Sequence, residues 1–169
     1  MLVKCKESPP PIDLPDEETF LSLPYALSEE QQTLSERVVA NFIDGKDTLL
    51  YAVCGSGKTE VSYGVIDYAL LHGLQAGFAL PRRDVVIELH QRLKDAFPKK
   101  KVIAVYGGHQ QELEGDIIVL TTHQLHRFPN FFDLLVMDEV DAFPYAGNEE
   151  LHQAFKDSLR GHCLLMSAT

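Results

Sequence analysis

The sequence feature that most constrains the fold is the stretch LLYAVCGSGKTE, from Leu49 to Glu60. Apolar and aromatic residues lead into two closely spaced glycines, Gly55 and Gly57, and a Lys-Thr pair follows. An apolar run of strand length before the glycines, with a helical stretch after them, predicts a strand, a tight turn and a helix. In such a turn the backbone N–H groups and the positive end of the helix dipole face a bound phosphate. The alternative is an ordinary glycine-rich turn.

This stretch matches the phosphate-loop pattern G-x-x-x-x-G-K-[ST] once the first glycine is relaxed to Ala52. The pattern predicts nucleotide contacts throughout the loop, at Cys54, Gly55, Ser56, Gly57, Lys58 and Thr59. We expect Lys58 to reach the β- and γ-phosphates of ATP and the Thr59 hydroxyl to hold Mg²⁺. Cys54 stands where a hydroxyl or another small residue is expected, and oxidation of its thiol beside a cationic site could block the loop.

A second candidate site follows an apolar run about 80 residues further on, in the stretch LLVMDEVD. Asp138 ends this run, and an aspartate at the end of a strand next to a phosphate loop holds Mg²⁺, usually through water. Glu139 follows and is suited to polarise an attacking water. An acidic loop after any buried strand is the alternative. Ser167-Ala168-Thr169 also ends an apolar run, and by itself this small polar triplet is weak support.

Short apolar runs alternate with helix-like segments along most of the chain. We expect strands at 48–53, 76–80, 102–105, 117–120, 134–137 and 163–166, and helices at 28–43, 58–72, 84–97 and 149–159. The apolar runs are nearly continuous, which is typical of strands covered on both faces. The sequence therefore predicts an α/β domain over residues 27–169, with a mostly parallel central sheet and helices on both faces. Residues 1–26 hold more than half of the nine prolines, which predicts an extended lead-in or linker.

The charge distribution limits the possible partners. The formal net charge is −10, which argues against general binding of polyanions. Residues 81–101 are the exception, because seven basic residues, including Arg82 and Arg83, outnumber three acidic ones. This basic window is either a local nucleic-acid face or a solvated helix followed by a lysine-rich loop.

Cysteine and histidine usage disfavours a disulfide framework and a metal centre. The three cysteines form no C-x-x-C pair, and the seven histidines lack ligand spacing. No apolar run approaches the ~20 residues of a membrane span, and the first residues lack the apolar core of a signal peptide. We therefore expect a soluble protein in a reducing, intracellular setting.

The order of phosphate loop, DEVD and SAT resembles the first motor lobe of superfamily-2 helicases. The stretches LPRRDVVIELHQRL, VYGGH, TTHQLHRF and above all VMDEVDAFPY are similar to the ComFA family, late-competence ATPases related to the primosomal helicase PriA. The resemblance covers residues 27–169 and implies a RecA-like phosphate-loop NTPase lobe that uses ATP and Mg²⁺. It implies an ATP-driven translocase that pulls transforming single-stranded DNA into the cell. The family works with the competence uptake machinery at the cytoplasmic face of the membrane.

The resemblance also implies roles for individual residues. Gln31 corresponds to a glutamine that reads the adenine edge, although it also stands at the capping-box position after Ser28. Contacts with the DNA backbone are implied at Pro81, Arg82, Arg83, Gly107, Gly108, Thr121, Thr122 and His123. Thr121 and Thr122 could instead, or also, cap a helix. Residues that link nucleotide state to lobe closure are implied at Asp141, Ser167 and Thr169.

The sequence departs from the family pattern at both ends. Only Cys5 precedes the motor, so the four-cysteine zinc module common in the family is missing from this chain, and the second motor lobe is missing after Thr169. Because that lobe supplies arginines to the ATP site, we expect weak binding of magnesium nucleotide and poor hydrolysis. A PriA-like replication-restart helicase lobe, a phosphate-loop binding module that is no motor, and a phosphate-loop kinase or transferase are the alternatives.

Overall fold

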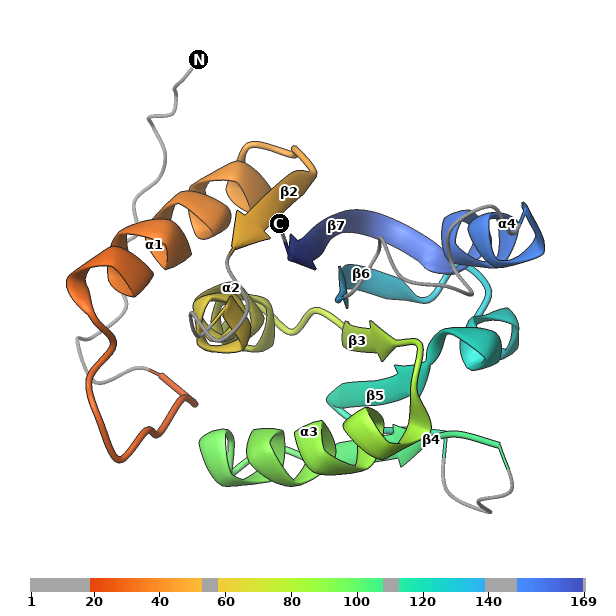
Figure 1. The fold of residues 1–169 in the computed structure, drawn as a ribbon, viewed down its shortest axis with the longest axis horizontal. Helices are drawn as coiled ribbons and strands as arrows, with labels where there is room; N and C mark the ends of the chain where they lie inside the picture. The colour runs from red at the N-terminus through yellow and green to blue at the C-terminus, as the bar shows by residue number, and fades with distance from the viewer. Residues whose placement is uncertain (1–18, 53–57, 108–112, 139–148, 169) are drawn as a thin grey trace.

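The computed structural model describes residues 19–52, 58–107, 113–138 and 149–168 (Figure 1). The elements are, in chain order, α1 (Glu29–Ile43), β2 (Thr48–Ala52), α2 (Lys58–Leu71), β3 (Ala76–Leu80), α3 (Arg83–Ala96), β4 (Val102–Val105), β5 (Ile117–Thr121), the 3₁₀ helix η1 (Thr122–Arg127), β6 (Phe132–Met137), α4 (Glu149–Ser158) and β7 (Leu159–Ala168). The alternation of strands and helices agrees with the sequence prediction.

The six described strands form one sheet in the order β2-β7-β6-β3-β5-β4, and Figure 1 shows them following one another from the top of the view downwards. Every neighbouring pair is parallel. Parallel neighbours need a crossover connection, and the structure describes a helix in each connection between consecutive strands except the one from β4 to β5. The predicted α/β architecture with a parallel sheet is confirmed.

Helices cover both faces of the sheet, which explains the continuous apolar strands. Phe78 and Leu80 of β3 pack with α1, α2 and α3 on one face. Ala79, between them, packs on the other face in a cluster that includes Leu125 of η1 and, at its margin, Phe155 of α4. Successive side chains of a strand point to opposite faces, so a strand buried on both faces must be apolar at every position.

Two elements differ from the prediction. Within the stretch TTHQLHRF, residues Thr122–Arg127 form η1, which is not among the expected helices although capping by Thr121 and Thr122 was considered, and Leu125 and Phe128 are buried. Strand β7 begins at Leu159, four residues before the predicted start. Of the added residues, LRGH, only Leu159 is apolar, so their sequence does not indicate a buried strand. They join the sheet because Leu159 pairs with Phe132 and the Arg160 guanidinium binds both carboxylate oxygens of Asp133, each at 2.9 Å.

The described part of the lead-in, residues 19–27, contains no helix or strand but packs against α2 and α3. The backbone N–H of Phe20 donates to Asp67 of α2 at 2.8 Å, and that of Ser22 donates to the carbonyl of Ala96 in α3 at 2.7 Å. The Lys100 ammonium lies 4.2 Å from the centre of the Phe20 ring. We name this segment the strap.

None of the described helices combines the length and apolar character needed to cross a membrane.

Candidate functional site

Most of the described candidate residues lie at one edge of the sheet, because its six strands run in the same direction. Ligands of open parallel sheets bind beyond the carboxyl ends of the strands. The residues that follow or end these strands are Thr59 beyond β2, Ser167 in β7, Asp138 after β6, Pro81 and Arg82 after β3, Thr121 and Thr122 at β5, and Gly107 after β4. In the order of the strands, the nucleotide residues occupy one half of the edge and the predicted DNA residues occupy the other.

The strand register fixes the boundary between these two halves. The backbone N–H of Asp138 donates to the carbonyl of Ala79 at 3.2 Å, which joins β6 to β3. On the other side of β3, Leu80 pairs with Thr121 of β5. Asp138 and the stretch beginning at Pro81 therefore leave the sheet side by side.

Two oxygen donors meet in the nucleotide half. Thr59, in the first turn of α2, and Asp138, which is buried, line one cavity of about 40 Å³. The described residues that also line it are Phe78, Leu80, Val85, Glu88, Leu89 and Arg92. A hydroxyl and a carboxylate are oxygen ligands of the kind that Mg²⁺ prefers, and Mg²⁺ usually keeps several waters beside one or two carboxylates. The described residues therefore fit the predicted magnesium site. They contain no cluster of three or more His, Cys, Asp or Glu side chains that could hold a metal alone.

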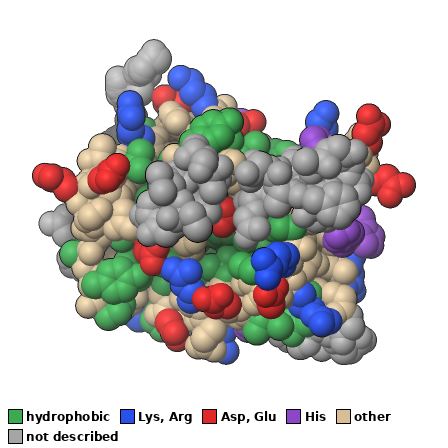
Figure 2. Space-filling model, in the orientation of Figure 1, with side chains coloured by type: hydrophobic (Ala, Val, Ile, Leu, Met, Phe, Trp, Pro, Cys, Tyr) green, Lys and Arg blue, Asp and Glu red, His purple; other side chains and the backbone are tan. Residues whose placement is uncertain are grey.

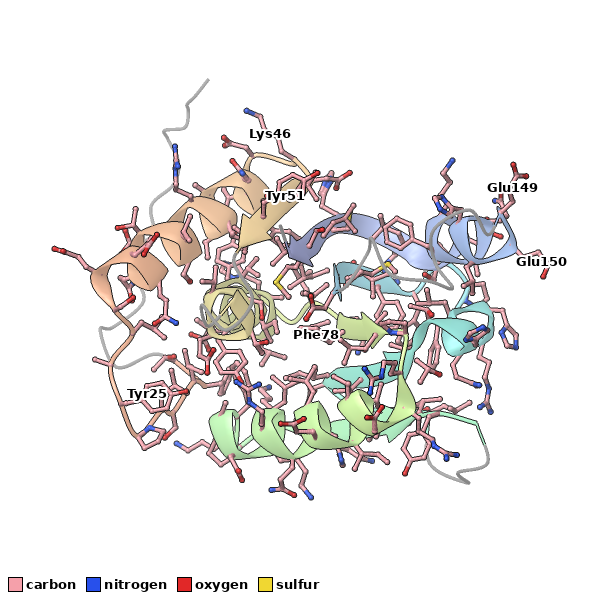
Figure 3. The ribbon with its side chains drawn as sticks, in the orientation of Figure 1. Tyr25, Lys46, Tyr51, Phe78, Glu149 and Glu150 are labelled. Carbon is pink, nitrogen blue, oxygen red and sulfur yellow. The ribbon has the colours of Figure 1, made fainter. Side chains whose placement is uncertain are left out.

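Several predicted nucleotide residues lie outside the described part of the chain. These are Cys54, Gly55, Ser56, Gly57, Glu139, Asp141 and Thr169. The backbone of Lys58 is described as the first residue of α2, but its side chain is not. Ser167 is buried in β7 and pairs with Tyr51 of β2 (Figure 3 labels Tyr51).

The predicted capping box at the start of α1 is confirmed. The Ser28 hydroxyl accepts from the Gln31 backbone N–H at 3.1 Å, and the Gln31 side-chain oxygen accepts from the Ser28 backbone N–H at 2.9 Å. The capping role of Gln31 is therefore formed. Because a carboxamide oxygen has two lone pairs and the nitrogen has two hydrogens, this role leaves the adenine role open as a prediction.

The predicted DNA residues differ in their exposure. Arg82, Arg83, Gly107 and His123 are exposed and Pro81 is half-buried. Gly108 lies outside the described residues. Thr121 occupies the N-cap position of η1 without a side-chain hydrogen bond. The Thr122 hydroxyl is buried and has no hydrogen-bond partner among the described residues. Side-chain capping by either threonine is therefore not formed, and in this arrangement the Thr122 side chain does not reach the surface.

Acidic neighbours offset the basic window. The Arg82 guanidinium lies 3.0 Å from the Asp84 carboxylate, and both side chains are exposed. This hydrogen bond holds the pKa of Asp84 below its usual range. Along α3 as a whole, three acidic residues balance three basic ones. Figure 2 shows basic and acidic side chains interleaved in the lower part of the visible face, where Figure 1 places α3. The window is a mixed charged surface in which Arg82 already has a counter-charge.

Sequence reasoning missed one group of interacting side chains beside the nucleotide half. Glu60 accepts a hydrogen bond from Arg92 at 2.8 Å and another from the Tyr25 hydroxyl at 2.9 Å. Next to them, burial raises the pKa of the Tyr63 hydroxyl to about 12. The only signal in the sequence was an acid immediately after the Lys-Thr pair. Its partners are 32 and 35 residues away, so only the fold identifies them.

Comparison with known proteins identifies the class. Residues 32–169 match the family model described as DEAD/DEAH box helicase. This match covers most of the chain, and the chain belongs to the DEAD/DEAH box helicase family.

Two curated relatives narrow the resemblance. The chain is 38% identical over 146 residues to the competence protein ComFA of Bacillus subtilis (strain 168). It is also 38% identical over 143 residues to the competence protein ComFA of Streptococcus pneumoniae (strain ATCC BAA-255 / R6). Each alignment covers 85% of this chain but only 32% and 33% of the relatives, so the chain spans about a third of their length. The resemblance to the ComFA family is confirmed.

Solved structures confirm the fold. The SWI2/SNF2 ATPase core of Sulfolobus solfataricus, in complex with double-stranded DNA, matches with a TM-score of 0.73 and 19% identity, over 88% of this chain and 34% of that one. A hypothetical ATP-dependent RNA helicase from Sulfolobus tokodaii matches with a TM-score of 0.65 and 21% identity. The match covers 85% of this chain and 51% of that one. The predicted RecA-like lobe is therefore the observed fold.

Proposed function

We propose that this chain is the ATP-binding lobe of an ATP-dependent single-stranded DNA translocase that drives DNA uptake in natural competence. The observation that carries the proposal is the order of the strands, which brings nucleotide residues and predicted DNA residues to adjacent halves of one sheet edge. Membership of a helicase family favours a motor over a phosphate-loop kinase or transferase. The identity with two ComFA proteins favours a competence motor over a PriA-like lobe.

On this proposal, ATP binds at the nucleotide half of the edge. The loop over residues 54–57 and Lys58 contact the phosphates, Thr59 and Asp138 hold Mg²⁺, and Glu139 orients the attacking water. Bound Mg²⁺ supplies charge neutralisation at the β- and γ-phosphates. Gln31 contacts the adenine edge. Asp141, Ser167 and Thr169 are the proposed links between nucleotide state and lobe closure.

The DNA contacts occupy the other half. Phosphates are bound by arginines, small hydroxyls and backbone N–H groups, and the start of α3 offers Arg82 and Arg83 beside its first N–H groups. Arg82 must exchange the Asp84 carboxylate for a DNA phosphate, which costs little because both side chains are exposed. Since Thr121 and Thr122 are buried, we propose that this stretch contacts DNA chiefly through its backbone and through His123.

A single lobe offers only one wall of such an ATP site. An arginine supplied across the cleft is worth about 10³–10⁵ in turnover in related phosphate-loop enzymes. We therefore propose that this chain alone binds magnesium nucleotide weakly and hydrolyses it poorly. The full motor would work with the competence uptake machinery, in the cytoplasm and at the inner face of the bacterial membrane.

The experiment that tests the proposal measures two ligands on one chain. Magnesium-bound non-hydrolysable ATP is titrated by calorimetry, and labelled single-stranded DNA is titrated by fluorescence anisotropy. We expect Lys58→Ala to lose nucleotide binding and keep DNA binding, and the double variant Arg82→Glu, Arg83→Glu to show the converse. Circular dichroism confirms that each variant is folded. A non-motor binding module would bind nucleotide without binding DNA. If Lys58→Ala binds nucleotide as tightly as the parent, the phosphate-loop assignment is wrong.

A further inference from the structure

The first turn of α2 carries Lys58 and Thr59. The strand that precedes this turn is paired on one side only in the described sheet. Strand β2, which leads toward the turn, is the edge strand of the described sheet and pairs there with β7 alone. Asp138, by contrast, follows β6, which is paired on both sides. Helix α2 packs on the face of the sheet through its apolar side, and contacts of its first turn with elements outside the sheet add to what sets Thr59 relative to Asp138.

Glu60 supplies such a contact. It follows Thr59 directly, and its Oε2 accepts hydrogen bonds from Arg92 of α3 at 2.8 Å and from the hydroxyl of Tyr25 in the strap at 2.9 Å. The Glu60 side chain is only 13% exposed, against 41% for Arg92, so the pair is partly shielded from solvent. Figure 3 places Tyr25 on the segment that leads into α1, and its bond joins that segment to the start of α2.

Arg92 also faces the magnesium site. It lines the same small cavity as Thr59 and Asp138. An arginine there with no counter-charge would repel Mg²⁺, because two cations would then compete for the field of one buried carboxylate. Glu60 offsets that charge and fixes the guanidinium in one direction. Glu88 of α3 lines the cavity as well, so a second acidic side chain besides Asp138 faces it.

We propose that Glu60 and Arg92 form a positioning pair that holds the Mg²⁺-binding turn of α2 against α3, with Tyr25 as a third member. Neither side chain contacts the phosphates. The pair keeps the Thr59 hydroxyl at a fixed place relative to Asp138 and keeps the Arg92 charge away from the metal. Because α3 begins at the predicted DNA residues, the pair also joins the two halves of the site through one rigid helix. The inference rests on the proposed function.

The test compares Glu60→Gln, Arg92→Met and the double variant with the unsubstituted chain. Nucleotide affinity is measured by calorimetry with and without Mg²⁺, and amide hydrogen exchange of the first turn of α2 is measured without nucleotide. We expect each single variant to weaken binding of magnesium nucleotide about tenfold. A tenfold change in affinity corresponds to the loss of about 1.4 kcal/mol of binding free energy. Binding of the Mg²⁺-free nucleotide should change less than threefold, and exchange at residues 59–62 should accelerate.

The double variant and two controls distinguish a pair from two separate effects. We expect the double variant to bind no worse than the weaker single variant, because partners in one interaction are not additive. Glu36→Gln and Arg37→Met remove the same charges from exposed positions of α1 and should match the parent. Tyr25→Phe, which removes one hydroxyl, should show a smaller effect in the same direction. Melting temperatures of the apo variants should stay within about 4 °C of the parent, because the pair is partly exposed.

Two results would overturn the inference. One is unchanged affinity for magnesium nucleotide in Glu60→Gln while the parent binds it. The other is a double variant whose loss equals the sum of the single losses. If the parent itself binds no magnesium nucleotide, the proposed function fails, and the exchange rates of the first turn then decide the inference alone: unchanged rates refute it and faster rates support it.

Discussion

Gly77 is the second residue of β3, and its lack of a side chain makes room for Phe132. A Cβ atom at this position would lie 2.5 Å from Cδ1 of the Phe132 ring, far inside the ordinary contact distance. The ring is fully buried and packs against Phe128 and Phe131, at centroid distances of 5.5 and 5.1 Å. It cannot move away without disturbing its neighbours.

The cost of Gly77→Ala follows from this contact. Overpacking a buried position lowers the free energy of unfolding by about 1–3 kcal/mol. Replacing glycine by alanine raises it by about 0.4–1 kcal/mol, because alanine restricts the unfolded chain. We therefore expect the free energy of unfolding to fall by about 1–2 kcal/mol. For a domain of this size the melting temperature should fall by about 3–8 °C.

Urea denaturation followed by circular dichroism measures the change, and a second substitution identifies its cause. Phe132→Leu removes the ring that the new methyl group would meet. We expect the variant with both substitutions to be more stable than the sum of the single effects by at least about 1 kcal/mol. Strict additivity, or a Gly77→Ala variant as stable as the parent, would show that the packing of Phe132 over β3 is not as described.

Three further predictions concern catalysis, DNA binding and pH. On the proposed function, ATP turnover by this chain should stay near background and should not rise when single-stranded DNA is added; turnover comparable with that of a two-lobe relative would contradict the proposal that these residues form only part of the ATP site. Asp84→Asn should tighten binding of single-stranded DNA a few-fold at low salt by releasing Arg82, and a weaker or unchanged affinity in anisotropy titrations would place the DNA elsewhere. Arg160 lowers the pKa of Asp133, so this carboxylate stabilises the fold above its unfolded pKa of about 4, and the contribution is lost as the pH falls through the lower folded pKa. Asp133→Asn should therefore lose less stability between pH 7 and about pH 3 than the parent in urea denaturation, and equal losses would contradict the role of the pair.

Several local features of the fold could be predicted from the sequence. Ser28 and Gln31 form the predicted capping box because both partners lie within one helical turn. The strand at 76–80 was predicted at its observed bounds, since five consecutive apolar residues suit a strand buried on both faces. The sequence also led us to expect Thr59 and Asp138 near one another, and both line one cavity, while their roles toward Mg²⁺ stay a prediction.

Other features depended on partners distant in the sequence. The start of β7 depends on Asp133, which binds Arg160 from another strand. Arg82 and Asp84 are only two residues apart, but the sequence analysis counted the net charge of residues 81–101. A net charge does not say which charged side chains form ion pairs, so this pair was not predicted.

By itself the sequence determined the strand–loop–helix unit, the buried strands and the residue types suited to phosphate and Mg²⁺. These follow from hydrogen bonding and apolar periodicity within a few neighbouring residues. Only the tertiary structure decided the order of the strands, the division of one sheet edge into two halves, and the contact of Glu60 with Arg92 and Tyr25. Those relations join residues that are far apart along the chain, and the packing of helices against the sheet brings them together.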